Sequence, residues 1–346
     1  MNKNDILFSH NELMLTDTGD FAVHNELIEQ YKIIDFHTHI YESIYAGLPS
    51  VIRRKIINNS NSFFDMSCYP GGVSNFSLNK VGYRTWPETV FSKEGINTLL
   101  RLYGKGVLSL IRSATKERLV HDMNKSSVAS SVLLPINTIK GNEIQETIKA
   151  VNDDDRFIVF GSVHPLDKNI EIQIDQQLKL GVKGFKINPH VWGIDFDSPE
   201  MKNLIGLLYE TQKPIISCSG IAIPHTFRHL PKGIWKNMRT QDLKKFLYCF
   251  KQFPDINLIL AHGGLEQNED LIKLMEEFPN VYSDISMQPS ENIRNMITNI
   301  GYERLLFGSD YPFFNQAFSI LSVLKATESE IERKAIFRGN AEFLLG

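Results

Sequence analysis

The chain has 346 residues, of which 42% are apolar and 22% charged, a composition that suits a globular protein with a large core. A net charge of -3 gives no basic footprint, so a nucleic-acid partner is not expected. The sequence has no run of about 18 apolar residues and no signal-peptide pattern near Met1, so neither a membrane partner nor secretion is predicted. Three cysteines without paired spacing indicate a reduced, cytoplasmic protein.

The first 31 residues form an extension with a hairpin pattern. In LMLTDTGDFAV, at 13–23, residues alternate on both sides of a turn that contains glycine. This pattern predicts a small hairpin ahead of the main domain, which we place at 32–346.

Eight short apolar segments follow, and each is typical of a buried strand. They lie at 33–39, 131–135, 157–163, 184–188, 214–219, 257–262, 281–286 and 305–310. Helical patterns separate the later ones, at 142–154, 171–181, 201–212, 242–253 and 269–278. Eight alternating units predict an α/β fold, a TIM (β/α)8 barrel. An open doubly wound sheet is the alternative, but no glycine-rich phosphate loop follows the first strand.

One connection is too long for this repeat. Residues 41–128 leave from the first strand and contain a helical pattern, INTLLRLYGKGVLSLIRSA. Long connections in compact domains are often lids or binding elements. We expect either a cap over the site or a helical subdomain used for oligomerisation.

Two histidines at the end of the first strand carry the strongest chemical signal. His37 and His39 in IIDFHTHI are two residues apart, so both side chains face the same side of the strand. Neutral imidazole binds zinc and similar divalent ions. A pair of structural, hydrogen-bonded histidines is the alternative. The C-terminal end of a barrel strand is where such folds build active sites, which favours a metal site.

Two later strands also end in polar groups. Asp310 ends LLFGSD, and a carboxylate buried there must be paired, protonated or metal-bound. We predict that it binds the metal and accepts a proton from an activated water, with a helix N-cap as the alternative. His262 in LILAHGG is predicted to orient that water or polarise a substrate carbonyl, with a buried structural role as the alternative.

The fourth strand carries Lys186 in GFKINPH, with His190 and Trp192 just beyond it. A lysine inside a barrel is interpreted as an anchor for a substrate carboxylate, a carbamylated bridge between two metals, or the ionic partner of Asp310 or Asp35. His190 and Trp192 are predicted to line the substrate pocket.

Together these motifs resemble the amidohydrolase superfamily, and within it the amidohydrolase-related branch, which includes metal-dependent hydrolases and aminocarboxymuconate-semialdehyde-decarboxylase-like proteins. The resemblance covers most of 32–346 and rests on IIDFHTHI, GVKGFKINP, LILAHGG and LLFGSDYPF in this order. It implies a distorted eight-stranded barrel with a metal at its C-terminal mouth. It also implies that His37, His39 and Asp310 are ligands and His262 an active-site polar group.

The fifth strand departs from the family pattern, in which a histidine ligand is usual. Here the segment reads PIISCSG, and Cys218 occupies the expected histidine position. A thiolate is a good zinc ligand, so Cys218 is predicted to complete the site and to favour zinc. The alternatives are a small buried cysteine in a site with weakened metal binding, or a cysteine nucleophile.

A stretch rich in basic residues follows Gly220. His225, Arg228 and His229 are predicted to bind a carboxylate or phosphate group of the substrate. A solvated basic loop is the alternative.

These residues predict a metal-dependent hydrolase that activates water for attack on an amide, ester or lactone carbonyl of a small molecule. The expected cofactor is a divalent metal, zinc by preference, and His262 and Lys186 would stabilise the oxyanion. The expected partners are a carboxylated small-molecule substrate and further copies of the same chain in a homo-oligomer. Two alternatives stay open: a non-oxidative decarboxylase of the same family, and a metal-free barrel that binds a small molecule.

Overall fold

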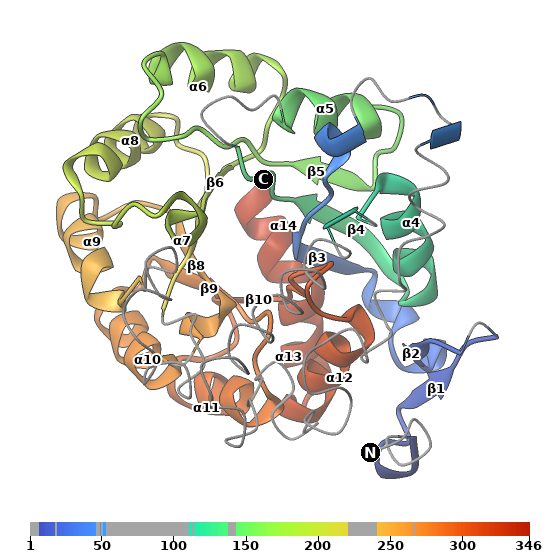
Figure 1. Cartoon of the computed structure of the whole chain (residues 1–346). Coiled ribbons are helices and arrows are strands. Elements are labelled where there is room, and N and C mark those ends of the chain that lie inside the picture. Colours follow the sequence, from blue (N-terminus) through green and yellow to red (C-terminus); the bar gives the residue numbers. More distant parts are fainter. Residues whose placement is uncertain are drawn as a thin grey trace, which may run out of the picture.

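A ring of parallel strands with helices on its outer side dominates the computed structural model of the chain (Figure 1). The structure describes residues 7–17, 19–45, 49, 51–52, 111–112, 114–137, 143–220, 241–265 and 267–346. The eight predicted strands are all present, each within its predicted segment or one to three residues from it. They are β3 (Ile33–Thr38), β4 (Val128–Leu133), β5 (Phe157–Val159), β6 (Phe185–Ile187), β7 (Ile215–Cys218), β8 (Leu258–Ala261), β9 (Val281–Asp284) and β10 (Leu305–Leu306). The predicted TIM barrel is confirmed.

The strands pair as two parallel sheets, in the orders β10-β9-β8-β7-β6 and β3-β4-β5. Two parallel bridges join these sheets, between Gly161 and Phe185 and between Thr38 and Tyr311. At the second junction the Asp310 N–H donates to the His37 carbonyl (2.9 Å). The ring therefore closes beside the two histidines, and the closure brings the end of the eighth strand against the first.

The helices between the strands cover the outside of the ring (Figure 1). The outer layer consists of α4 (Lys116–Lys125), α5 (Glu143–Val151), α6 (Ile170–Lys179), α8 (Pro199–Glu210), η9 and α9 (Leu243–Phe246, Leu247–Gln252), α10 (Asn268–Glu277) and α11 (Ser290–Ile300), with α12 (Gln316–Ala326) and α13 (Glu330–Lys334) after the last strand. One further short helix is α7 (Pro189–Trp192). The five predicted helical patterns correspond to α5, α6, α8, η9–α9 and α10. The short α7 differs from the others, because it follows β6 directly and does not belong to the outer layer.

The barrel interior is apolar near the starts of the strands. Ile34, Ile216 and Ile259, each the second residue of its strand, belong to one buried cluster. The C-terminal helix α14 (Asn340–Leu345), which follows a π-helical turn at Ala335–Gly339, adds Ala341 and Leu344 to this cluster. Since α14 packs at the strand starts, the opposite, C-terminal ends are left for polar groups.

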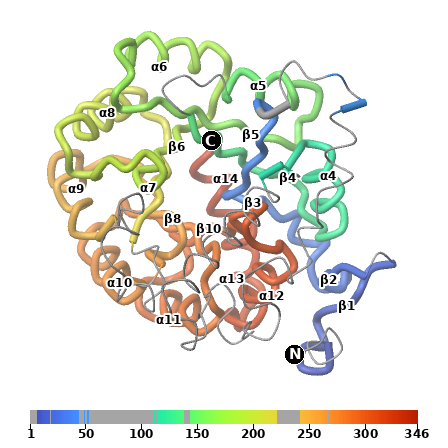
Figure 2. Tube along the Cα trace, viewed as in Figure 1, coloured from blue at the N-terminus to red at the C-terminus, as the bar shows by residue number. Residues whose placement is uncertain are grey.

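The N-terminal extension contains the predicted hairpin. Strands β1 (Leu13–Leu15) and β2 (Phe21–Val23) pair antiparallel, and two short 3-10 turns, η1 (Asn25–Leu27) and η2 (Glu29–Tyr31), lead into β3. The hairpin lies beside α12 (Figure 2), where the rings of Phe21 and Phe318 are 5.2 Å apart. The extension thus packs on the outside of the barrel.

Most of the long connection at 41–128 lies outside the described residues, and so does the cap predicted there. Its described parts include η3 (Glu42–Tyr45), which packs against α5, and α4, which packs against β4. Within the described ranges, no helix is long and apolar enough to cross a bilayer.

Candidate metal centre

Three of the predicted ligands meet at the C-terminal mouth of the barrel. His37 and His39 both direct Nε2 at one carboxylate oxygen of Asp310, at 3.5 and 3.4 Å. All three side chains are buried. Strand alternation puts the two histidines on one face of β3, and closure of the barrel supplies the aspartate.

The spacing of these atoms suits a divalent metal. With bonds of 2.0–2.2 Å, neighbouring ligand atoms of a tetrahedral site lie about 3.3–3.6 Å apart. The two distances to Asp310 fall in this range, and one carboxylate with two imidazoles is a common donor set for catalytic zinc. The donors present at this mouth therefore fit a divalent ion.

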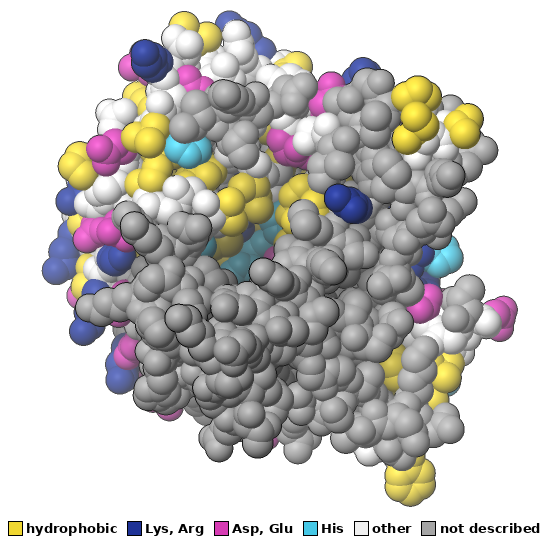
Figure 3. All heavy atoms as spheres, in the orientation of Figure 1, with side chains coloured by type: hydrophobic (Ala, Val, Ile, Leu, Met, Phe, Trp, Pro, Cys, Tyr) yellow, Lys and Arg dark blue, Asp and Glu magenta, His cyan; other side chains and the backbone are white. Residues whose placement is uncertain are grey.

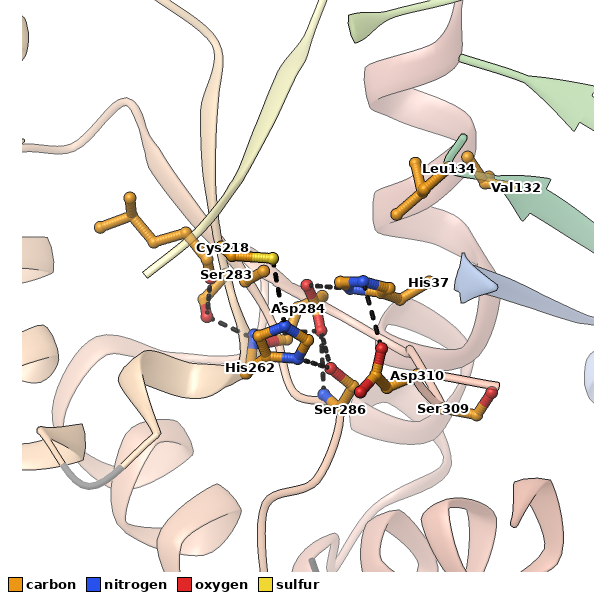
Figure 4. A network of polar contacts seen from close by, with 12 residues as sticks. His37, Val132, Leu134, Cys218, His262, Ser283, Asp284, Ser286, Ser309 and Asp310 are labelled. Carbon is orange, nitrogen blue, oxygen red and sulfur yellow. Dashed lines mark hydrogen bonds and ion pairs between the residues drawn. The ribbon is translucent and has the colours of Figure 1, made fainter. Parts of the chain in front are cut away.

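Both histidines are held in the tautomer that leaves Nε2 free to bind. Nδ1 of His39 donates to the Leu134 carbonyl (2.7 Å), and Nδ1 of His37 donates to Asp284 (2.9 Å; Figure 4). Burial, together with the nearby Lys186 ammonium, lowers the pKa of His37 to about 3, so the ring is neutral at physiological pH. Each Nε2 then carries a lone pair that faces Asp310.

Asp284, at the end of β9, connects this triad to His262. Its other oxygen accepts hydrogen bonds from the Ser286 hydroxyl and the Ser286 N–H (3.0 Å). Burial would raise the pKa of Asp284, but the His37, His262 and Ser286 contacts outweigh it, and the pKa lies well below its usual range. Asp284 is therefore a buried carboxylate that orients the first histidine.

His262 lies beside His37 and is held through Ser286. Its Nδ1 is 2.8 Å from the Ser286 hydroxyl, and its ring centroid is 4.6 Å from that of His37. Burial alone would lower the pKa of His262, but the charges of Asp310 and Cys218 outweigh burial and raise the pKa to about 9. The ring is therefore a buried cation that can donate hydrogen bonds from both nitrogens.

Cys218 points at His262 (Figure 4), with Sγ 3.6 Å from Nε2. Burial would raise the pKa of its thiol, but Lys186, His190 and His262 outweigh burial and hold it well below the usual range. Among the described residues, two groups have metal-ligand spacing, and Cys218 is in neither: one is His37, His39 and Asp310, and the other is His37, His262 and Asp284. Ligation by Cys218 therefore stays a prediction.

Lys186, on β6, reaches the same group of side chains. Its Nζ is 3.3 Å from Nε2 of His37, the nitrogen that would face a metal. An ammonium group and a metal ion cannot share that lone pair, so Lys186 must move away from Nε2 when a metal binds. The charge would then remain beside the ion, where it could meet an anionic substrate group.

Of the other residues predicted to contact the substrate, two are described by the structure and three are not. His190 and Trp192 lie on α7, where Nε2 of His190 is 3.1 Å from the Gly220 carbonyl. His225, Arg228 and His229 lie outside the described residues.

Two buried groups of the site were not predicted from the sequence. Asp284 and Ser286 complete the network around His262, and both lie at or just after the end of an interior strand, as Asp310 does. A polar residue at the end of a predicted strand was therefore a signal by which Asp284 and Ser286 could have been found. A further buried carboxylate, Asp35 on β3, accepts hydrogen bonds from Ser309 and Gln316. Its burial raises its pKa to about 6, although Ser309 and Gln316 oppose the shift.

Comparison with known families adds a match over more than half the chain. A family model described as amidohydrolase matches residues 142–346. This region includes β6 to β10 and hence Lys186, Cys218, His262 and Asp310. No curated protein sequence matches the chain significantly.

Solved structures with the same fold cover nearly the whole chain. An uncharacterized TIM-barrel protein from Bordetella bronchiseptica is 17% identical, with a TM-score of 0.58 over 90% of this chain and 98% of that one. A 5-carboxyvanillate decarboxylase from Novosphingobium aromaticivorans, with manganese and 3-methoxy-4-hydroxy-5-nitrobenzoic acid bound, is 17% identical, with a TM-score of 0.58 over 92% and 98%. A probable 2-pyrone-4,6-dicarboxylic acid hydrolase from Acinetobacter baumannii is 12% identical, with a TM-score of 0.53 over 91% and 99%.

Proposed function

The chain belongs to the amidohydrolase family, and from this premise we propose that it is a metal-dependent hydrolase that acts on a carbonyl of a small, carboxylated molecule. The observation that supports the proposal is the group formed by His37, His39 and Asp310, whose spacing and tautomers suit one divalent ion. Zinc is the ion we propose, with Cys218 as a fourth ligand.

When bound, the ion would supply Lewis acidity and an acidified water. The chain's own residues account for the proton transfers. His37 and His39 both contact Oδ1 of Asp310. The other carboxylate oxygen, Oδ2, accepts the proton of the attacking water. His262 is a cation whose Nδ1 is held by Ser286, and its Nε2–H would exchange the contact with Cys218 for a hydrogen bond to the oxygen on which negative charge develops.

Lys186 has the second role in this proposal. Its ammonium group is buried and its described polar contact is the neutral Nε2 of His37, not a carboxylate. A substrate carboxylate would pair with this ammonium group directly. We extend the anion-binding role to His225, Arg228 and His229, and a pocket-lining role to His190 and Trp192.

The same lysine favours a second candidate function, a non-oxidative decarboxylase. A buried cation beside the metal would also hold a carboxylate that is to be lost, and one of the structural relatives is a decarboxylase. The two reactions differ in where the oxygen of water goes, because only hydrolysis adds it to an organic product.

The test uses metal-loaded protein with panels of lactones, esters, amides and aromatic carboxylates in ¹⁸O-labelled water. Hydrolysis predicts one ¹⁸O in the acid product and no carbon dioxide, and Asp310→Asn should lose turnover while it keeps the fold. Carbon dioxide release without label in the organic product would replace the hydrolase with the decarboxylase. Retained turnover in Asp310→Asn would contradict the proposed role of that carboxylate.

A further inference from the structure

Three loops meet above the β4–β6 side of the barrel mouth. The indole Nε1 of Trp192, at the end of α7, donates to the backbone carbonyl of Asn137, which follows β4 (2.8 Å). The Trp192 ring also packs against His164, which follows β5, with ring centroids 5.2 Å apart. The Asn137 N–H donates to the Ser162 hydroxyl (3.3 Å), so three successive strand ends are tied together.

This arrangement is fixed at both ends of α7. The Asn188 side chain accepts from the Val191 N–H (3.1 Å) and caps the helix, and Gly193 ends it in a left-handed conformation (φ 66°). On the side away from Trp192, His190 contacts the Gly220 carbonyl after β7 (3.1 Å). A helix of four residues thus spans from the loops of β4 and β5 to that of β7, as a rigid wall of the mouth.

Two polar groups of the wall have no partner among the described residues. The side-chain oxygen Oδ1 of Asn137 is buried and makes no hydrogen bond there, although the residue is 7% exposed. Leaving a buried polar atom unpaired costs free energy. Nδ1 of His164 accepts from the Leu166 N–H (3.2 Å), so the neutral ring carries its proton on Nε2, which has no described acceptor. The wall therefore offers one acceptor and one donor.

The wall is close to the metal site because both grow from the same strands. The Leu134 carbonyl, which holds His39, is three residues before Asn137, so their Cα atoms are at most about 11 Å apart. Lys186, which contacts His37, is likewise six residues before Trp192. The space-filling view shows a hollow on this face, with hydrophobic and histidine side chains visible in it (Figure 3). A ligand that meets both would carry a carboxylate for Lys186 and a second polar group for the wall.

We propose that Asn137, His164 and Trp192 form a substrate subsite for an uncharged planar group that carries a hydrogen-bond donor beside an acceptor, as a carboxamide or hydroxyl does. The donor pairs with Oδ1 of Asn137, the acceptor with Nε2–H of His164, and the flat part of the group lies on the indole. This subsite rests on the proposed function, since it binds the part of the substrate remote from the reacting carbonyl.

Charge decides what the subsite rejects. None of its three side chains carries a charge, and burial lowers the pKa of His164, although Asp167 opposes the shift, so the imidazole stays neutral at physiological pH. A second carboxylate at this position would lose solvation without gaining an opposite charge from these residues. The subsite therefore separates substrates with a neutral remote group from dicarboxylates.

The experiment compares probes of nearly equal shape on the metal-loaded full chain by isothermal titration calorimetry. The probes are 3- and 4-carbamoylbenzoate, the corresponding dicarboxylates, and 3- and 4-isopropylbenzoate. The two hydrogen bonds, to Asn137 and to His164, predict that the better carbamoyl probe binds more tightly, by roughly fivefold or more, than its isopropyl and dicarboxylate counterparts. Equal affinities, or no binding of carbamoyl probes at millimolar concentration, would overturn the proposal.

Two variants assign the preference to the named atoms. His164→Phe keeps a ring against Trp192 but removes the N–H donor, and Asn137→Leu keeps the volume but removes the acceptor. Each should lower the carbamoyl preference at least twofold and leave isopropyl affinity unchanged, whereas His121→Phe, on the exposed side of α4, should keep the full preference. A full preference in both folded variants would contradict the assignment, and the wild-type comparison decides if neither variant folds. Failure of the proposed hydrolase is distinguishable, because it changes turnover but not the ratio of probe affinities.

Discussion

Replacing Asp284 by asparagine should weaken metal binding while leaving the proposed ligands His37, His39 and Asp310 in place. The carboxylate accepts Nδ1–H of His37 at 2.9 Å, and both side chains are fully buried. Asparagine keeps the size but removes the charge that orients the ring and raises its basicity. Loss of an outer partner of a histidine ligand typically costs tenfold to a hundredfold in metal affinity, about 1.4–2.7 kcal/mol. A charge-assisted hydrogen bond contributes about 1.5–3 kcal/mol, which agrees with this range.

The assay is a competition titration of zinc between the protein and a chromophoric chelator, for the wild type, Asp284→Asn and the control Asp255→Asn. Asp255 is exposed, so its replacement should leave the zinc Kd unchanged. Circular dichroism and thermal unfolding check that Asp284→Asn is folded. An unchanged zinc Kd in a folded Asp284→Asn protein would refute the argument that Asp284 prepares His37 for the metal.

Two further substitutions test separate parts of the structure. If Cys218 is a ligand, Cys218→Ser should weaken zinc binding about tenfold while changing manganese binding less, because zinc is the softer ion; parallel changes for both metals would count against ligation. Glu143 contacts Ser43, and burial raises its pKa from 4.5 to about 7, although Ser43 opposes the shift. The folded state therefore binds the Glu143 proton more tightly than the unfolded state does. The resulting contribution to the free energy of unfolding is complete below about pH 4.5, and up to about 3 kcal/mol of it is lost as the pH rises to about 7. Glu143→Gln should flatten that slope in urea unfolding at pH 5 and 7, and a slope equal to the wild type would contradict the effect.

The barrel was predictable because its strands are buried on both faces. Each reads as a short apolar run, and the polar residue that ends the run marks the mouth, as in LILAH and LLFGSD. The pairing of His37 with Asp310 also followed from this rule, because the C-terminal ends of all parallel strands meet at one face.

The connections inside the site were less predictable. Asp284 ends VYSD, inside the predicted strand segment 281–286, but the pattern does not indicate which side chain its carboxylate contacts, so its bond to His37 came only from the structure. Spacing alone shows that Cys218 faces the mouth, but whether its sulfur meets a metal or His262 depends on a side-chain position that no pattern encodes. Asn137 and His164 lie after their strands, where loop geometry decides what each contacts.

The central claim is that His37, His39 and Asp310 hold a divalent metal, and metal content per chain tests it most directly. Elemental mass spectrometry of protein purified without chelator should find about one zinc or manganese per chain, a value that drops to near zero in the double variant His37→Asn/His39→Asn. Two metals per chain would instead indicate a carbamylated Lys186 as a bridge. No metal in the wild type, even after incubation with zinc or manganese, would contradict the account and favour a barrel that binds its small molecule without one.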